Sequence, residues 1–208
     1  MKVEIEHRGI LTNEKFKQLN RFFQTKGKFL GKKKRFSVIY FLTNKKIKKI
    51  EELKNEKIDL RIRITNKKTE LVMKYGKWGA TEARREFLFL IKSEQFDQMI
   101  EFLKILGFYQ GVLNATETYL YKYRGIDFAL VKVPSWGYYF EAEIMGEKRQ
   151  IKKLNEKILT ESKKLGLEIF TNNALCQLLD QLNNRKGFRF NFKKEKFLDI
   201  KKRFINYF

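Results

Sequence analysis

Strict alternation of apolar and charged residues constrains the fold of this chain more than any other feature. The alternation is clearest over residues 3–8, over residues 58–65 and over the second half of residues 138–144. Successive side chains of a β-strand point to opposite faces, so each segment is predicted to form a strand with one apolar and one charged face. Less regular patterns predict further strands over residues 36–42, 69–75, 82–91, 116–124 and 126–133.

Apolar residues at helical spacing predict amphipathic helices between these strands. The expected helices cover residues 12–27, 93–107, 147–165 and 173–182. Residues 44–57 are too charged to contribute to a core and are expected to form an excursion. The order of elements, with several hairpins, predicts an α+β fold on an antiparallel sheet or barrel.

The charge balance of the chain points to an anionic partner. Lys and Arg number 46 and Asp and Glu 24, which gives a formal charge of +22. Cys176 is the only cysteine, which excludes an intramolecular disulfide and a thiolate zinc cluster. Acids near the start and the lack of a long apolar run predict a cytoplasmic protein with no membrane partner.

The charges on the predicted strands are sorted by sign, some strands carrying acids and others bases. A face that only has to be soluble is expected to mix signs, although an ordinary solvated face stays the alternative. Paired carboxylates suit Mg²⁺ or Mn²⁺, and Arg and Lys suit phosphate oxygens. The candidate metal ligands are Glu4, Glu6, Glu141 and Glu143, and the candidate phosphate-binding residues are Arg8, Arg61, Arg63, Lys74, Arg84, Lys122 and Arg124.

Several of these segments resemble one known family in order along the chain. Glu4-Ile5-Glu6-His7-Arg8 is similar to the ExExK signature of the CYTH domain, the triphosphate tunnel metalloenzymes. The later segments that resemble its strand motifs are Asp59 to Arg63, Leu71 to Lys74, Arg84 to Glu86 and Val133 to Glu143. The last is similar to a pattern shared by class IV adenylyl cyclases and thiamine triphosphatases.

The resemblance implies a closed antiparallel eight-stranded β-barrel, a triphosphate tunnel with helices packed outside. We expect this domain over residues 1–182, followed by a basic, aromatic C-terminal extension over residues 183–208. The implied activity is metal-dependent hydrolysis of inorganic or small organic triphosphates, with Mg²⁺ or Mn²⁺ as cofactor. The alternative within the family is a class IV adenylyl cyclase that makes cyclic AMP and pyrophosphate from ATP. No residue is assigned as the catalytic group, and the sequence sets no oligomeric state.

The chain departs from the family pattern at two positions. Arg8 stands where the signature has Lys, which keeps the charge but changes its shape. Val131 stands where many members have an Asp, and Asp127, four residues earlier on the same phase, is the candidate substitute.

A different class of function, nucleic-acid binding, is the other alternative. Basic clusters occur at residues 32–35, 45–49 and 185–203, the last with interleaved Phe, and clustered Lys neutralises phosphates without sequence specificity. The protein would then bind an RNA 5′-triphosphate or another nucleic acid on an inactive tunnel scaffold. His7, the sole histidine, lies on the apolar phase and is predicted to be packed rather than catalytic.

Overall fold

The structure is a computed structural model, and it describes residues 2–41, 58–75, 85–171 and 184–208 together with positions 174, 177 and 181. The chain divides into two compact units, which we describe separately. The first comprises Met1–Lys33 and Thr116–Leu175, and the second comprises Lys34–Ala115 and Cys176–Phe208. The predicted excursion over residues 44–57 and Arg84 lie outside the described residues, as does most of the predicted helix over 173–182.

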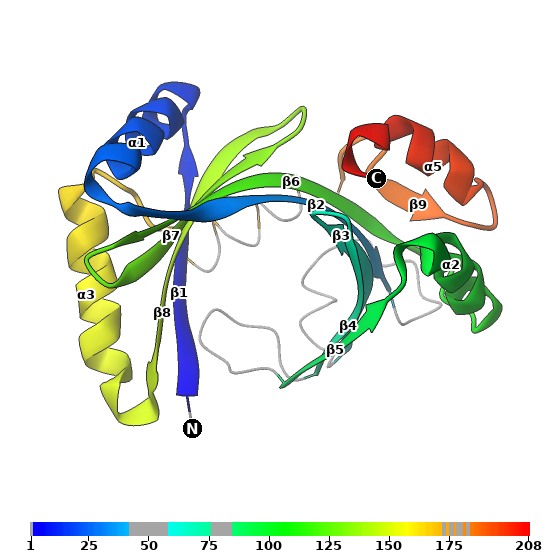
Figure 1. The fold of residues 1–208 in the computed structure, drawn as a ribbon, viewed down its shortest axis with the longest axis horizontal. Helices are drawn as coiled ribbons and strands as arrows, with labels where there is room; N and C mark the ends of the chain where they lie inside the picture. Colours follow the sequence, from blue (N-terminus) through cyan, green and yellow to red (C-terminus); the bar gives the residue numbers. More distant parts are fainter. Residues whose placement is uncertain are drawn as a thin grey trace. The chain divides into compact units, whose positions relative to one another are not determined.

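Antiparallel strands dominate the fold (Figure 1). They are β1 (Lys2–Leu11), β2 (Lys28–Tyr40), β3 (Ile58–Thr65), β4 (Lys68–Tyr75), β5 (Arg85–Ile91), β6 (Gln110–Tyr123), β7 (Ile126–Val133), β8 (Gly137–Glu147) and β9 (Arg189–Asn191). The hydrogen-bonded order is β1-β8-β7-β6-β2-β3-β4-β5, and β9 pairs with β6. The predicted α+β fold on an antiparallel sheet is therefore confirmed.

The predicted closure of the sheet into a barrel is not confirmed. Closure requires the first and last strands of the order to exchange backbone hydrogen bonds. Among the described residues, the order instead has two ends, β1 and β5. Alternation within a strand indicates which residues share a face, but it does not indicate which strands pair. The prediction of a closed barrel therefore depends on the family resemblance alone.

Helices form where apolar residues recur at helical spacing. They are α1 (Asn13–Lys26), α2 (Phe96–Ile105), α3 (Ile151–Lys164) and the short α5 (Phe197–Arg203). The Thr12 hydroxyl caps α1 by accepting a hydrogen bond of 3.1 Å from the backbone N–H of Lys15. Within the described ranges, no helix is both long and apolar enough to span a bilayer.

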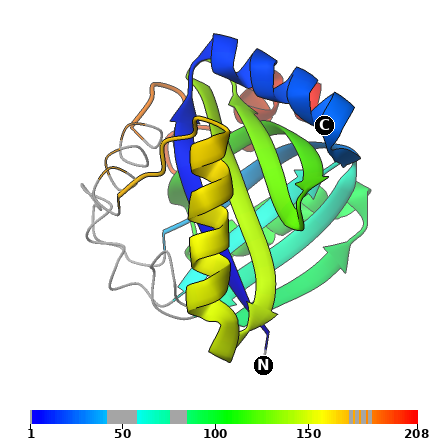
Figure 2. The same cartoon turned by 90° about the vertical axis from the view of Figure 1, so that its left-hand side faces the viewer.

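In the first unit, the helices α1 and α3 cover the apolar face of strands β1, β6, β7 and β8. Figure 2 shows α3 lying along β8 and β1. Ile158 of α3 and Phe23 of α1 are fully buried against Phe128 and Ala142 of the strands. The opposite face of these strands carries the charged residues.

In the second unit, the C-terminal segment supplies part of the core. Figure 1 shows β9 and α5 beside α2, in agreement with the ring contact of 5.6 Å between Phe96 and Phe197. The buried residues of this core come from β2, β3 and β6, from α2 and from residues 188–204. Those of the C-terminal segment are Phe188, Phe190, Phe192, Ile200 and Phe204.

Candidate functional site

A row of charged residues crosses the sheet of the first unit. Glu6 lies opposite Glu143, Glu143 opposite Asp127, and Asp127 opposite Lys122. Directly opposed residues of antiparallel strands point to the same face, so these four side chains share the face turned away from the apolar core. The register therefore aligns one side chain from each of β1, β8, β7 and β6.

Arg8 joins two acids on the same face. It lies opposite Glu141, and its Nε atom is 2.6 Å from Glu6 Oε1 and 3.0 Å from Glu141 Oε1. Burial lowers the pKa of Arg8, but attraction to Glu141 and Glu6 outweighs this effect and raises the pKa above its ordinary value. Arg8 is thus a charged partner for two of the four predicted metal ligands.

Glu143 is crowded by the other acids. Burial, a hydrogen bond with Glu4 and the negative charges of Glu4, Glu6 and Glu141 raise the pKa of Glu143 to about 8. The Glu143 carboxyl group therefore holds a proton at neutral pH, and its hydrogen bond to Glu4 requires one.

This donor set fits a divalent cation in its chemistry. Carboxylate oxygens are the ligands that Mg²⁺ and Mn²⁺ prefer, and a cation would take the place of the proton on Glu143. Within the described part of the chain, however, no three or more His, Cys, Asp or Glu side chains are already arranged to hold a metal ion. Arg8 lies between Glu6 and Glu141, so a cation that used either carboxylate would have to displace this guanidinium.

Asp127 and Val131 occupy the same face of β7. Asp127 lies opposite Glu143, and its Oδ1 atom is 3.1 Å from Lys122 Nζ. Val131, at the position where the family resemblance expects an Asp, is buried opposite Tyr139. Strand β7 thus has a carboxylate, that of Asp127, four residues before Val131 on the same face and directly beside Glu143.

Arg124 is not brought together with the carboxylates. Strand β6 ends at Tyr123, and Arg124 occupies the following turn with a φ of 51°. Its Nη1 atom is 3.0 Å from Glu161 Oε2 on α3, the helix that covers the apolar face. The alternation that places Lys122 on the charged face does not extend past the end of the strand, so it does not apply to Arg124.

In the second unit, Arg61, Arg63 and Lys74 share the charged face of β3 and β4, each beside an acid. Arg61 donates a hydrogen bond of 3.0 Å from Nε to Asp59 Oδ1. Arg63 lies 2.5 Å from Glu70, and Lys74 lies 3.1 Å from Glu86. The predicted basic set is therefore neutralised by neighbouring acids, which the sorting of charges within single strands did not predict.

Ser37 is a residue that the sequence reasoning missed. It lies opposite Arg63 on β2, it is 1 % exposed, and its hydroxyl has no hydrogen-bond partner. A buried hydroxyl without a partner is unusual in a folded protein. Its position between apolar Phe36 and Val38 was the available signal, because it places Ser37 on the phase of the predicted charged face.

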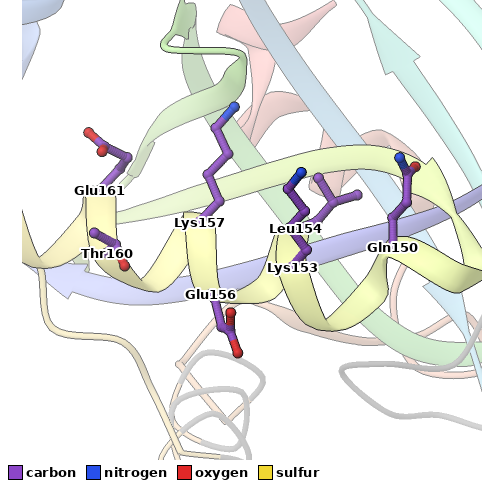
Figure 3. Close-up of a pocket in the computed structure, with 7 residues that line it drawn as sticks. All are labelled: Gln150, Lys153, Leu154, Glu156, Lys157, Thr160 and Glu161. Carbon is purple, nitrogen blue, oxygen red and sulfur yellow. The ribbon is translucent and has the colours of Figure 1, made fainter.

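A hollow of about 510 Å³ lies elsewhere, along α3 (Figure 3). Its lining residues are Gln150, Lys153, Leu154, Glu156, Lys157, Thr160 and Glu161. None of the predicted site residues lines it. His7 also faces this helix, with its Nε2 atom 2.5 Å from Asn155 Oδ1, in agreement with its predicted packing role.

The raised pKa of Glu143 predicts a pH-dependent stability without added metal. The folded chain binds this proton more tightly than the unfolded chain, whose carboxyl has the ordinary pKa of 4.5. Stability should therefore fall as the pH rises from 4.5 to about 8 and then change little from this cause. Thermal melts across this range should show the decline, and Glu143→Gln should flatten it. An equally steep decline in the variant would contradict the assignment.

Comparison with known proteins supports the fold. The family model described as the CYTH domain matches residues 2–172. The structure of PH1819 protein from Pyrococcus horikoshii is similar with a TM-score of 0.63 and 24% identity, covering 86% of this chain and 99% of that chain. No curated protein matches the sequence.

Two further similar structures carry names that mention an activity. A candidate adenylate cyclase from Vibrio parahaemolyticus has a TM-score of 0.58 and 15% identity, covering 82% of this chain and 94% of that one. A candidate adenylyl cyclase from Hippeastrum, described as having a dominant triphosphatase activity, has a TM-score of 0.54 and 17% identity. The alignment covers 86% of this chain and 96% of the Hippeastrum chain. Likenesses at these identities show a shared fold.

Proposed function

The chain belongs to the CYTH domain family, and from this membership we propose that it is a metal-dependent hydrolase of inorganic or small organic triphosphates. The observation that carries the proposal is the crowding of acids around Glu143, which raises the pKa of that carboxyl to about 8. Such crowding is costly without a cation and favours binding of one. The triphosphatase activity named for the similar Hippeastrum protein supports the choice of reaction.

The metal ligands we propose are Glu4, Glu6, Glu141 and Glu143, with Mg²⁺ or Mn²⁺ as the cation. A bound divalent cation supplies charge neutralisation at the phosphoryl oxygens and lowers the pKa of a water molecule. Asp127, opposite Glu143, and Lys122 beside it extend this charged row.

Phosphate oxygens are the proposed ligands of the basic residues on β3 and β4. Arg61, Arg63 and Lys74 would exchange their present carboxylate partners for phosphate oxygens, which accept charge-assisted hydrogen bonds from the same N–H groups. These donors would offset negative charge that develops on the phosphoryl group during transfer.

A phosphate-release assay tests the proposal directly. Tripolyphosphate, ATP and thiamine triphosphate would each be incubated with the full chain and either Mg²⁺ or Mn²⁺. We expect metal-dependent release from at least one of them and none after chelation. Absence of release from all three with both metals would contradict the hydrolase assignment.

A class IV adenylyl cyclase is the second candidate, because a similar Vibrio structure carries the cyclase name. Both reactions need a metal ion and a bound triphosphate, and they differ in the phosphorus that is attacked. Chromatography of an ATP incubation separates the two. ADP with phosphate supports hydrolysis, whereas cyclic AMP with pyrophosphate supports the cyclase.

Replacing Arg8 by lysine should strengthen metal binding. Arg8 contacts both Glu6 and Glu141, and the compact Lys ammonium is expected to hold only one of them. Loss of one partly exposed ion pair is worth about 0.2–1 kcal/mol, so the Kd for Mn²⁺ should fall roughly one-and-a-half- to fivefold. Calorimetric titration without substrate measures this change, and weaker binding by the Arg8→Lys protein would show that Arg8 does not compete with the cation.

A further inference from the structure

The C-terminal segment over residues 184–208 lies beyond the family match, which ends at residue 172. It is nevertheless folded, since β9 pairs with β6 and five of its apolar side chains are buried in the core of the second unit. Its surface side chains therefore extend from a fixed backbone.

This segment is strongly basic. Its 25 residues include nine Lys and Arg against two acids, a net charge of +7. Of these two acids, Glu195 contacts Arg203, while Lys201 contacts Asp97 of α2. Asp199, the other acid of the segment, is exposed in the first turn of α5.

Arg203 joins three stretches of the segment, each of which carries exposed lysines. Its Nη2 atom is 3.1 Å from Glu195 Oε2 and 3.5 Å from the carbonyl oxygen of Gly187. These contacts bring together three stretches of the segment, around residues 186, 195 and 203. The lysines next to the three contact points, here called the basic patch, are Lys186, Lys194, Lys196 and Lys202, all exposed.

The basic patch differs from the charged strand faces in having no acidic partners. Across the described ranges, no carboxylate lies within ion-pair distance of these four lysines, whereas Arg61, Arg63 and Lys74 each have one. Like charges held close together repel one another, and an external anion relieves that repulsion.

The chemistry of the patch specifies an extended anion. Exposed lysines in the turns and the short helix α5 act as point charges, which suits successive phosphates of a long chain rather than one enclosed ligand. The aromatic rings of the segment are largely in the core, so base stacking is not offered. Only Leu198 and Ile205 are exposed apolar residues here, too few for the apolar face of a membrane-binding helix.

We propose that the basic patch binds the phosphodiester backbone of a nucleic acid without base preference. This binding is independent of the proposed triphosphate chemistry. If the four lysines contact about four phosphates, counterion release predicts that affinity falls roughly 50- to 150-fold between about 50 and 200 mM salt.

Fluorescence anisotropy with a labelled 20-nucleotide RNA, and with DNA of the same sequence, tests the proposal on the full chain. The patch variant replaces Lys186, Lys194, Lys196 and Lys202 by Gln. The matched control replaces four exposed lysines of the first unit, Lys17, Lys152, Lys153 and Lys163, by Gln and so has the same net charge. Circular dichroism melts check that both variants fold.

We expect RNA and DNA to bind alike, and the patch variant to lose about three units of the slope of log affinity against log salt. The control should keep the parent slope. Equal losses in both variants would show that net charge alone attracts the nucleic acid and would overturn the proposal. Binding to vesicles containing phosphatidylserine with no binding to either oligonucleotide would overturn it as well.

Discussion

Replacing Glu4 and Glu6 together by glutamine is expected to abolish metal-dependent triphosphate hydrolysis while leaving the chain folded. The two side chains supply half of the proposed metal ligands, and a bound cation provides several kcal/mol of charge stabilisation in phosphoryl transfer. Each 1.36 kcal/mol corresponds to a factor of ten in rate, so turnover should fall by about 10³ or more.

Stability should be unchanged or slightly increased in this variant. The ion pair between Glu6 and Arg8 is partly exposed and is worth at most about 1 kcal/mol. Against this loss, removing two negative charges beside Glu143 relieves the repulsion that raises its pKa. Steady-state assays and metal-dependent shifts of the melting temperature measure both effects.

The matched control for this variant is Glu156→Gln with Glu168→Gln. Both residues are exposed in the first unit and lie outside the charged strand face. Because this control also replaces two carboxylates by amides, its change in net charge is the same. Turnover by the control should stay near the parent value. Equal inactivation of the control would show that these two acids have no specific role as metal ligands. Unfolding of the Glu4 and Glu6 variant would show that the two acids are structural.

Alternation of apolar and charged residues, which repeats every two residues, predicted the strands and their faces well where it is strong. The prediction over residues 58–65 coincides with β3, and that over residues 138–144 lies within β8. The reason is physical, since burial of one face of a strand fixes the phase of every side chain in it. The same argument placed Glu6 and Glu143 on one face, and the register then set them opposite each other.

Features that depend on pairing between strands could not be predicted from the sequence. The contacts of Arg63 with Glu70 and of Lys74 with Glu86 follow from the register of β4 against its two neighbours. Strand β2 begins at Lys28, well before the predicted start at residue 36. Its first residues are mostly exposed, so no alternating apolar face indicated them in the sequence. Arg124 shows the converse error, in which the period was extended past the end of a strand.

The C-terminal segment combines a basic surface with a buried apolar side. Its phenylalanines pack beside α2 and β6. Phe190 lies opposite Gly111 on β6, with its ring 5.4 Å from that of Tyr40 and 4.5 Å from that of Phe192. A chain that ends before this segment would leave the core of the second unit open.

Phe190→Ala is therefore expected to lower the free energy of unfolding by about 3–5 kcal/mol, the usual cost of emptying a buried Phe site. That loss is a large part of the roughly 5–15 kcal/mol that holds a domain folded. Urea unfolding measures it, with Leu198→Ala as the control, since Leu198 is 58% exposed and its truncation should change stability by no more than about 0.5 kcal/mol. Similar effects of the two substitutions would mean that the segment is only loosely attached. Deleting residues 184–208 should be more damaging still, because the deletion removes five buried side chains at once along with the strand that pairs with β6.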